Sequence, residues 1–218
     1  MGGMSSRAVL RRKIQTFLNE ADYSELVDLA GREPAVTPLL LQFLYAPQDL
    51  LSWRALEGLG NLARGHPAQV RKIIHRLLWL LNEDSGSFGW LAAAALGEIG
   101  RNRLSVVQEI IPMFCGFLEE DFSRGPMLWG VGRLAEVHPG EAEEVKPWAR
   151  WCLTHPDPQV RALSAWCLGK MGDREAREAL AALLNDEQPA EIYDQGELRP
   201  TTVAQAAREA LDRLDAGL

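Results

Sequence analysis

Histidine and cysteine, the side chains that most often ligate metals or act as nucleophiles, are few in this sequence and are not spaced as a site. There are four histidines and three cysteines. Three of the histidines, His66, His138 and His155, stand directly before proline, which places them in turns. No Cys-x-x-Cys pair and no His-Glu dipeptide occurs, so the ligand spacings of a zinc knuckle and of a paired His-Glu iron site are missing. We therefore expect no metal and no cofactor.

Catalysis without a metal has no better support. The sequence lacks a Gly-x-Ser-x-Gly elbow that would expose a nucleophilic serine, and it lacks a Gly-x-x-x-x-Gly-Lys loop that would hold a phosphate. The acidic cluster Glu141, Glu143 and Glu144 lies where a helix is expected to begin. Carboxylates at that end interact favourably with the helix dipole, so a solvated helix start explains them. The sequence therefore predicts no catalytic residues and a protein that is not an enzyme.

Arginine and tryptophan are the residues whose chemistry this chain does offer, and that chemistry is recognition. The candidates are Arg71, His75, Arg76, Trp79, Trp148 and Trp151. Tryptophan and arginine dominate the binding energy of protein interfaces. We expect these six residues to bind a protein or peptide partner. The alternative is that the tryptophans pack between helices, because tryptophan is usually mostly buried.

The charge of the chain is acidic overall but uneven. Its 23 basic and 30 acidic residues give a net charge of −7, which disfavours nucleic acid and anionic membranes as partners. Residues 64–76, however, hold Arg64, Arg71, Lys72 and Arg76 and no acid. An odd number of cysteines and the lack of any apolar run of about 18 residues predict reduced, buried thiols, a cytoplasmic location and no membrane contact.

A repeat supplies the elements that must position these side chains. The motif apolar-Gly-x-apolar occurs around Gly60, Gly97, Gly132 and Gly169, which are 37, 35 and 37 residues apart. Leucines mark the same period at Leu44, Leu81, Leu118 and Leu153. A period of this length is typical of solenoids built from stacked helix pairs.

Each unit is predicted to hold two helices. The first, for example 87–101, is rich in glycine and alanine, which lets neighbouring helices approach closely. The second shows an apolar stripe at helical spacing, as in 67–82 and again in 105–119. Breaks are expected at 64–67, 85–86, 123–126, 138–140 and 155–158. No alternating strand pattern occurs among these units, so the fold class is all-α, a right-handed α-solenoid of antiparallel helix pairs.

The ends depart from the repeat, as capping units do. We expect a single domain over 1–218, with degenerate N-terminal capping helices in 1–46 and four repeats in 47–185. The polar segment 186–201 forms either an ordered loop or a small hairpin, and a capping helix follows over 202–214. The pair Thr202 and Gln205 has the spacing of a capping box.

The residues of the fourth unit resemble a known family. Residues 157–161 read Asp-Pro-Gln-Val-Arg and are followed by Ala165 and Leu168-Gly169, a pattern similar to a HEAT repeat of the phycobilisome-lyase-like kind. The resemblance implies an α-solenoid whose second helices line the concave face, and it implies binding as the common use. It does not imply lyase activity, because many proteins share this scaffold.

The six candidate residues fall on second helices. If the apolar stripe of 67–82 faces the core, Arg71, His75 and Trp79 point away from it. The positions equivalent to Trp79 in the next two units are Gly116 and Trp151. We therefore expect an exposed row of side chains on the concave face.

The most economical function is a non-catalytic interaction module that binds a protein or peptide on its concave face. One alternative is a nucleic-acid-acting protein similar to the alkylpurine DNA glycosylases, which the basic run favours and the net charge opposes. A further alternative is an accessory factor in cofactor or chromophore attachment. A continuous positive groove would favour nucleic acid, whereas an isolated basic patch beside aromatic residues would favour a peptide.

Overall fold

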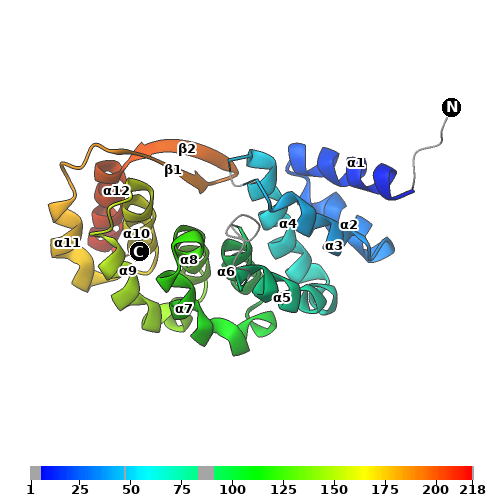
Figure 1. Ribbon diagram of the computed structural model, residues 1–218, viewed down its shortest axis with the longest axis horizontal. Coiled ribbons are helices and arrows are strands. Elements are labelled where there is room, and N and C mark those ends of the chain that lie inside the picture. The colour runs from blue at the N-terminus through cyan, green and yellow to red at the C-terminus, as the bar shows by residue number, and fades with distance from the viewer. Residues whose placement is uncertain (1–5, 47, 83–90, 218) are drawn as a thin grey trace.

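The computed structural model describes residues 6–46, 48–82 and 91–217. In this part the chain is an all-α solenoid of stacked helix pairs, as predicted (Figure 1). The first helices of the repeats are α4 (Leu50–Gly65), α6 (Ala92–Asn102), α8 (Asp121–Ala135) and α10 (Pro158–Lys170). The second helices are α5 (Pro67–Leu81), α7 (Phe114–Glu119), α9 (Lys146–Cys152) and α11 (Arg177–Ala182). None of the helices in the described residues is long and apolar enough to cross a membrane.

Other elements flank the repeats. Before them come α1 (Ser6–Asn19), α2 (Tyr23–Arg32), α3 (Val36–Leu40) and the 3-10 turn η1 (Leu41–Phe43). After them come β1 (Pro189–Asp194), β2 (Glu197–Thr202) and α12 (Val203–Ala216). The two strands pair antiparallel around Gln195 and Gly196, whose φ angles of 53° and 83° are those of a tight hairpin turn. The Thr202 hydroxyl accepts a hydrogen bond from the Gln205 backbone N–H at 3.1 Å and so caps α12.

Several second helices are shorter than predicted. The stretch 105–119 holds the 3-10 turns η2 (Leu104–Val106) and η3 (Gln108–Met113) before α7 begins. Pro112 lies inside η3 and has no N–H to continue an α-helical ladder. Similar turns, η4 (Pro139–Val145) and η5 (Arg174–Ala176), precede α9 and α11. The break predicted at 85–86 lies outside the described residues. So do residues 87–90 of the first helix predicted over 87–101, and α6 begins at Ala92.

The break predicted at 123–126 is wrong, because α8 runs through all four residues. The polar side chains there bind the end of the preceding helix instead of forming a loop. The Ser123 hydroxyl donates to the Phe117 carbonyl at 2.7 Å, and Arg124 Nε donates to the Leu118 carbonyl at 2.7 Å. Carbonyls left over at the end of a helix need such partners. Residues 123–126 therefore belong to the beginning of α8, and their side chains hold it against the end of α7.

The first helices pack against each other unusually closely. All four repeat glycines are buried, and a β-carbon on Gly97 would overlap the backbone of Gly130 in the next first helix. A β-carbon on Gly169 would lie 2.8 Å from the Ala210 Cα, and one on Gly132 would overlap the Trp166 ring. The prediction that the repeat glycines lie at helix contacts is thus confirmed. Close spacing in one layer of a two-layer solenoid makes the stack curve toward that layer.

Figure 1 shows this curvature. The first helices lie on the inside of the arc, the second helices form its outer side, and the β1–β2 hairpin lies across the inside. The contacts of the hairpin agree with the picture. Tyr193 of β1 reaches Glu57 on α4, while Glu191, two residues earlier in β1, binds Gln159 on α10. The prediction that second helices line the concave face is therefore wrong, because the glycine-rich first helices are the more closely spaced layer.

Candidate interaction surface

The outer face of α5 presents four of the six candidate residues. Its apolar stripe is buried as predicted, and the stripe consists of Val70, Ile73, Ile74, Leu77 and Leu81. Arg71, His75, Arg76 and Trp79 are all exposed on the opposite side. The Arg76 guanidinium carbon lies 3.9 Å from the centre of the Trp79 ring, within the range of a cation–π contact. The stack leaves 47% of Trp79 accessible.

The remaining two candidates lie on α9. Trp151 is 55% exposed, whereas Trp148 is half-buried and packs against the core. Their ring centres are 6.3 Å apart with the planes at 87°, an edge-to-face arrangement. The Arg124 guanidinium carbon lies 5.5 Å from the centre of the Trp151 ring. Trp148 thus supports the exposed ring of Trp151.

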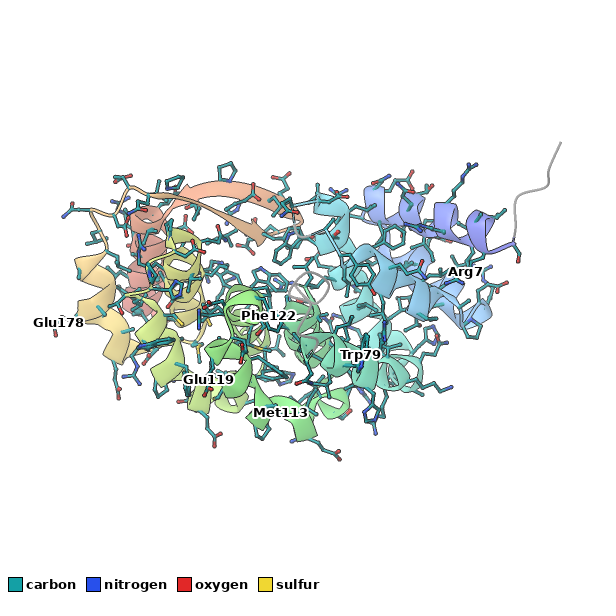
Figure 2. The ribbon with its side chains drawn as sticks, in the orientation of Figure 1. Arg7, Trp79, Met113, Glu119, Phe122 and Glu178 are labelled. Carbon is teal, nitrogen blue, oxygen red and sulfur yellow. The ribbon has the colours of Figure 1, made fainter. Side chains whose placement is uncertain are left out.

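Gly116 of α7 lies at the equivalent position between Trp79 and Trp151. It is exposed, and a β-carbon there would meet no atom within 4 Å. Met113, one turn earlier, is 44% exposed. Figure 2 shows Trp79 and Met113 on the side of the arc away from the hairpin. We call Trp79, Gly116 and Trp151 the outer row.

The outer row corrects the predicted location of the site. The candidates Arg71, His75, Arg76, Trp79, Trp148 and Trp151 belong to second helices, and these form the outer side of the arc rather than its concave side (Figure 1). The alternative that the tryptophans are packing residues holds for Trp148 in part, but Trp79 and Trp151 are exposed. Tryptophan is highly buried on average, and these two side chains, each about half exposed, depart from that average.

The concave side holds an aromatic cluster that the sequence did not reveal. The cluster consists of Trp53, Trp129, Trp166 and Tyr193. Tyr193 stacks on Trp53 with ring centres 5.1 Å apart, and its carbonyl accepts a hydrogen bond of 2.7 Å from Trp129 Nε1. The Tyr193 hydroxyl donates to Glu57 at 2.9 Å, and burial raises the pKa of Tyr193, with the Glu57 carboxylate adding to the shift. These contacts fasten the hairpin to the inner layer.

Charged side chains on the inner layer join successive repeats. Arg133 Nε donates to Glu98 at 2.8 Å, and Glu136 pairs with Arg101 at 3.0 Å and with Lys170. Burial raises the pKa of Glu98, and the nearby Arg133, which lowers it, only partly offsets this effect. Burial would also raise the pKa of Glu136, but Arg133, Lys170 and Arg101 outweigh it and hold that pKa below its usual value.

The sequence did contain a signal for this network. Glu98, Arg133 and Lys170 each follow a repeat glycine directly, so they share one position in three successive units. The side chain at that position is acidic in Glu98 and basic in Arg133 and Lys170. Opposite charges one repeat apart, at a position next to a close helix contact, predict an ion pair between repeats.

The described residues include no group of three or more histidine, cysteine, aspartate or glutamate side chains that could hold a metal ion. Two of the histidines that precede proline contact residues of other helices. His66 Nε2 bonds to the Val27 carbonyl at 3.0 Å, and His155 Nε2 lies 3.1 Å from Arg124 Nη1. These contacts connect turns to neighbouring helices.

Comparisons with known proteins agree with this architecture. Residues 128–195 match the family model described as HEAT repeats. An uncharacterized protein of Archaeoglobus fulgidus is 28% identical over 170 residues, which cover 76% of this chain and 90% of that protein. Among solved structures, a designed armadillo repeat protein superposes with a TM-score of 0.52 at 16% identity, covering 98% of this chain and 96% of the other. An engineered protein superposes with a TM-score of 0.51 at 17% identity, covering 95% and 97%.

Residues 128–195 thus resemble HEAT repeats, and the chain has an armadillo-like solenoid fold. The narrower resemblance to the phycobilisome-lyase-like kind stays a prediction. The cytoplasmic location also stays a prediction.

Proposed function

We propose that this protein is a non-catalytic interaction module that binds a protein or peptide partner through the outer side of its arc. The observation that carries the proposal is the exposure of Trp79 and Trp151, 47% and 55%, at equivalent positions two repeats apart. Trp53, Trp129 and Trp166, by contrast, are 8%, 0% and 5% exposed. The two tryptophans share one repeat position, and Gly116 occupies that position in the unit between them.

The inner side of the arc is partly covered (Figure 1). The hairpin lies across it, and Tyr193 fills the space between α4 and α8 through its contacts with Trp53 and Trp129. The carboxylates of Glu57, Glu98 and Glu136 also lie on this layer. No observation on this side favours the nucleic-acid-acting alternative, which needs a positive concave groove.

Photo-crosslinking tests the proposal directly. A photoreactive phenylalanine derivative placed at Trp151 or at Trp79 is expected to capture one defined partner in the native host, which mass spectrometry identifies. The same residue placed at Arg208, exposed on α12, is the control and should not capture it. Capture at position 208 alone, or an absence of capture at both tryptophan positions, would contradict the proposal.

A further inference from the structure

The outer face of α5 carries positive charge that no described carboxylate neutralises. Arg71, Lys72, His75 and Arg76 are exposed, and none of them forms an ion pair with a described residue, although many other arginines and lysines do. The chain as a whole has a net charge of −7, but these four side chains lie together on one helix. They create a local positive potential that attracts anionic groups.

A hollow of about 550 Å³ lies beside these cations, lined by Pro67, Ala68, Arg71, Lys72, Arg103 and Ser105. Arg103 comes from the next repeat, directly after α6. Arg71 Nη2 donates to the Ser105 carbonyl at 2.8 Å, which holds the guanidinium at the edge of the hollow and leaves its other N–H groups available. Three cations around one depression match a ligand that carries several carboxylates.

The same helix presents an aromatic surface at its other end. Arg71, His75 and Trp79 are spaced by four residues, so they form one stripe along α5. At 1.5 Å per residue, the distance along the helix from Arg71 to Trp79 is about 12 Å. The stripe therefore begins with cations and ends with Trp79, against which Arg76 is stacked.

We propose, building on the proposed function, that the partner segment bound by α5 is an acidic peptide in an extended conformation. Its carboxylates occupy the hollow formed by Arg71, Lys72 and Arg103. An apolar side chain of the same segment packs on Trp79. An extended chain advances about 3.3 Å per residue, so the apolar residue lies about four residues from the acidic group.

The extent of the basic patch favours a peptide over nucleic acid. The repeat positions that follow Arg76 are occupied by Met113 and Trp148, and those that follow His75 by Pro112 and Pro147. These two rows therefore carry no cation in the two units that follow α5. Nucleic acid is bound by a track of cations that follows its backbone.

Fluorescence anisotropy with synthetic peptides tests the proposal. The probe is a dye-labelled peptide in which a run of glutamates precedes a leucine by about four residues. We expect saturable binding that weakens as salt concentration rises, because surface charges are screened. A peptide with lysines in place of the glutamates is expected not to bind.

Charge reversals locate the site. The double variant Lys72→Glu, Arg103→Glu is expected to weaken binding of the acidic peptide at least tenfold. Both side chains are exposed and hold no ion pair with a described residue, so the helical circular dichroism spectrum should match that of the wild type. The matched control is Arg12→Glu, Arg208→Glu, which reverses two exposed charges on α1 and α12 and should bind like the wild type.

Four results would overturn the proposal. These are equal binding by the reversal and control variants, tighter binding of a single-stranded oligonucleotide than of the acidic peptide, no binding of the peptide at low salt, and self-association that Lys72→Glu abolishes. The last result would identify a second copy of this chain as the occupant. If crosslinking at Trp151 captures a partner while the acidic peptide fails, the proposed function stands and only the acidic chemistry of the partner is wrong.

Discussion

The backbones of Gly97 in α6 and Gly130 in α8 are in direct contact, because a β-carbon on Gly97 would overlap the Gly130 carbonyl group. Backbone cannot move aside as a flexible side chain can. The first helices therefore come together at a spacing that only glycine permits here. This contact belongs to the inner layer, and it helps to set the curvature that places the second helices on the outside.

Gly97→Ala is therefore expected to destabilise the protein by about 1–3 kcal/mol through overpacking. From sequence alone this substitution is nearly neutral if the β-carbon fits, and the structure shows that it does not fit. The control is Gly116→Ala, whose β-carbon meets open space and should raise stability slightly, since alanine favours helix. Urea unfolding of the two variants measures both effects. Equal stability of Gly97→Ala and wild type would show that the helices are not in contact there.

The pH dependence of stability should report on Glu136. Its folded pKa is lowered by Arg133, Lys170 and Arg101, so its carboxylate contributes stability that is fully present above its unfolded pKa of about 4.3. That contribution is lost as pH falls through the lower folded pKa. Glu136→Gln should cost about 1–3 kcal/mol at neutral pH and reduce the acid-side loss. Glu109→Gln, at an exposed position, should leave the profile unchanged. A profile that is identical in all three proteins would refute the role of Glu136.

The hairpin should depend on Tyr193 in two separable ways. Tyr193→Phe removes the hydroxyl, which bonds to Glu57, and is expected to cost about 1 kcal/mol. Tyr193→Ala also removes the ring contacts with Trp53 and Trp129 and is expected to cost about 3–5 kcal/mol. The folded pKa of Tyr193 is raised, so the wild type loses this contribution as pH rises above about 10. Tryptophan fluorescence during unfolding measures both effects. Equal losses in the two variants would mean that the ring does not pack as described.

The thiols should react unequally with a polar reagent in the native protein. Cys152 and Cys167 are fully buried, and burial raises the pKa of Cys152 to about 11 and that of Cys167 further. Cys115 is only half-buried, but burial still raises its pKa, so slow reaction of this thiol alone is expected. Mass spectrometry after labelling near neutral pH distinguishes the three. Rapid labelling of Cys152 or Cys167 without denaturant would show that the core opens readily.

Local sequence signals predicted the local structure well. The second helix expected over 67–82 is α5 at Pro67–Leu81, because its apolar stripe and its proline at the first turn are both local features. The break expected at 123–126 failed for a different reason. Ser123 and Arg124 donate hydrogen bonds to carbonyls of the preceding helix. Polar residues next to glycine and proline are also typical of loops, so the sequence did not distinguish the two roles.

The face of the arc on which the candidates lie could not be predicted from one repeat. It depends on which layer is more closely spaced, and the signal was present in the recurring glycines of the first helices. No sequence pattern indicated that the hairpin would cross the inner side of the arc (Figure 1). Tyr193 and Glu57 are 136 positions apart, and no repeat pattern connects them.

The affinity of a purified partner, identified by crosslinking, for tryptophan variants tests the central claim most directly. Trp79→Ala and Trp151→Ala are each expected to weaken binding by about 2 kcal/mol, or roughly thirtyfold, in isothermal titration calorimetry. Val9→Ala is the control, since Val9 is 51% exposed on α1 and lies outside the outer row. Unchanged affinity in both tryptophan variants, with folding intact, would contradict the assignment of the outer row as the binding surface.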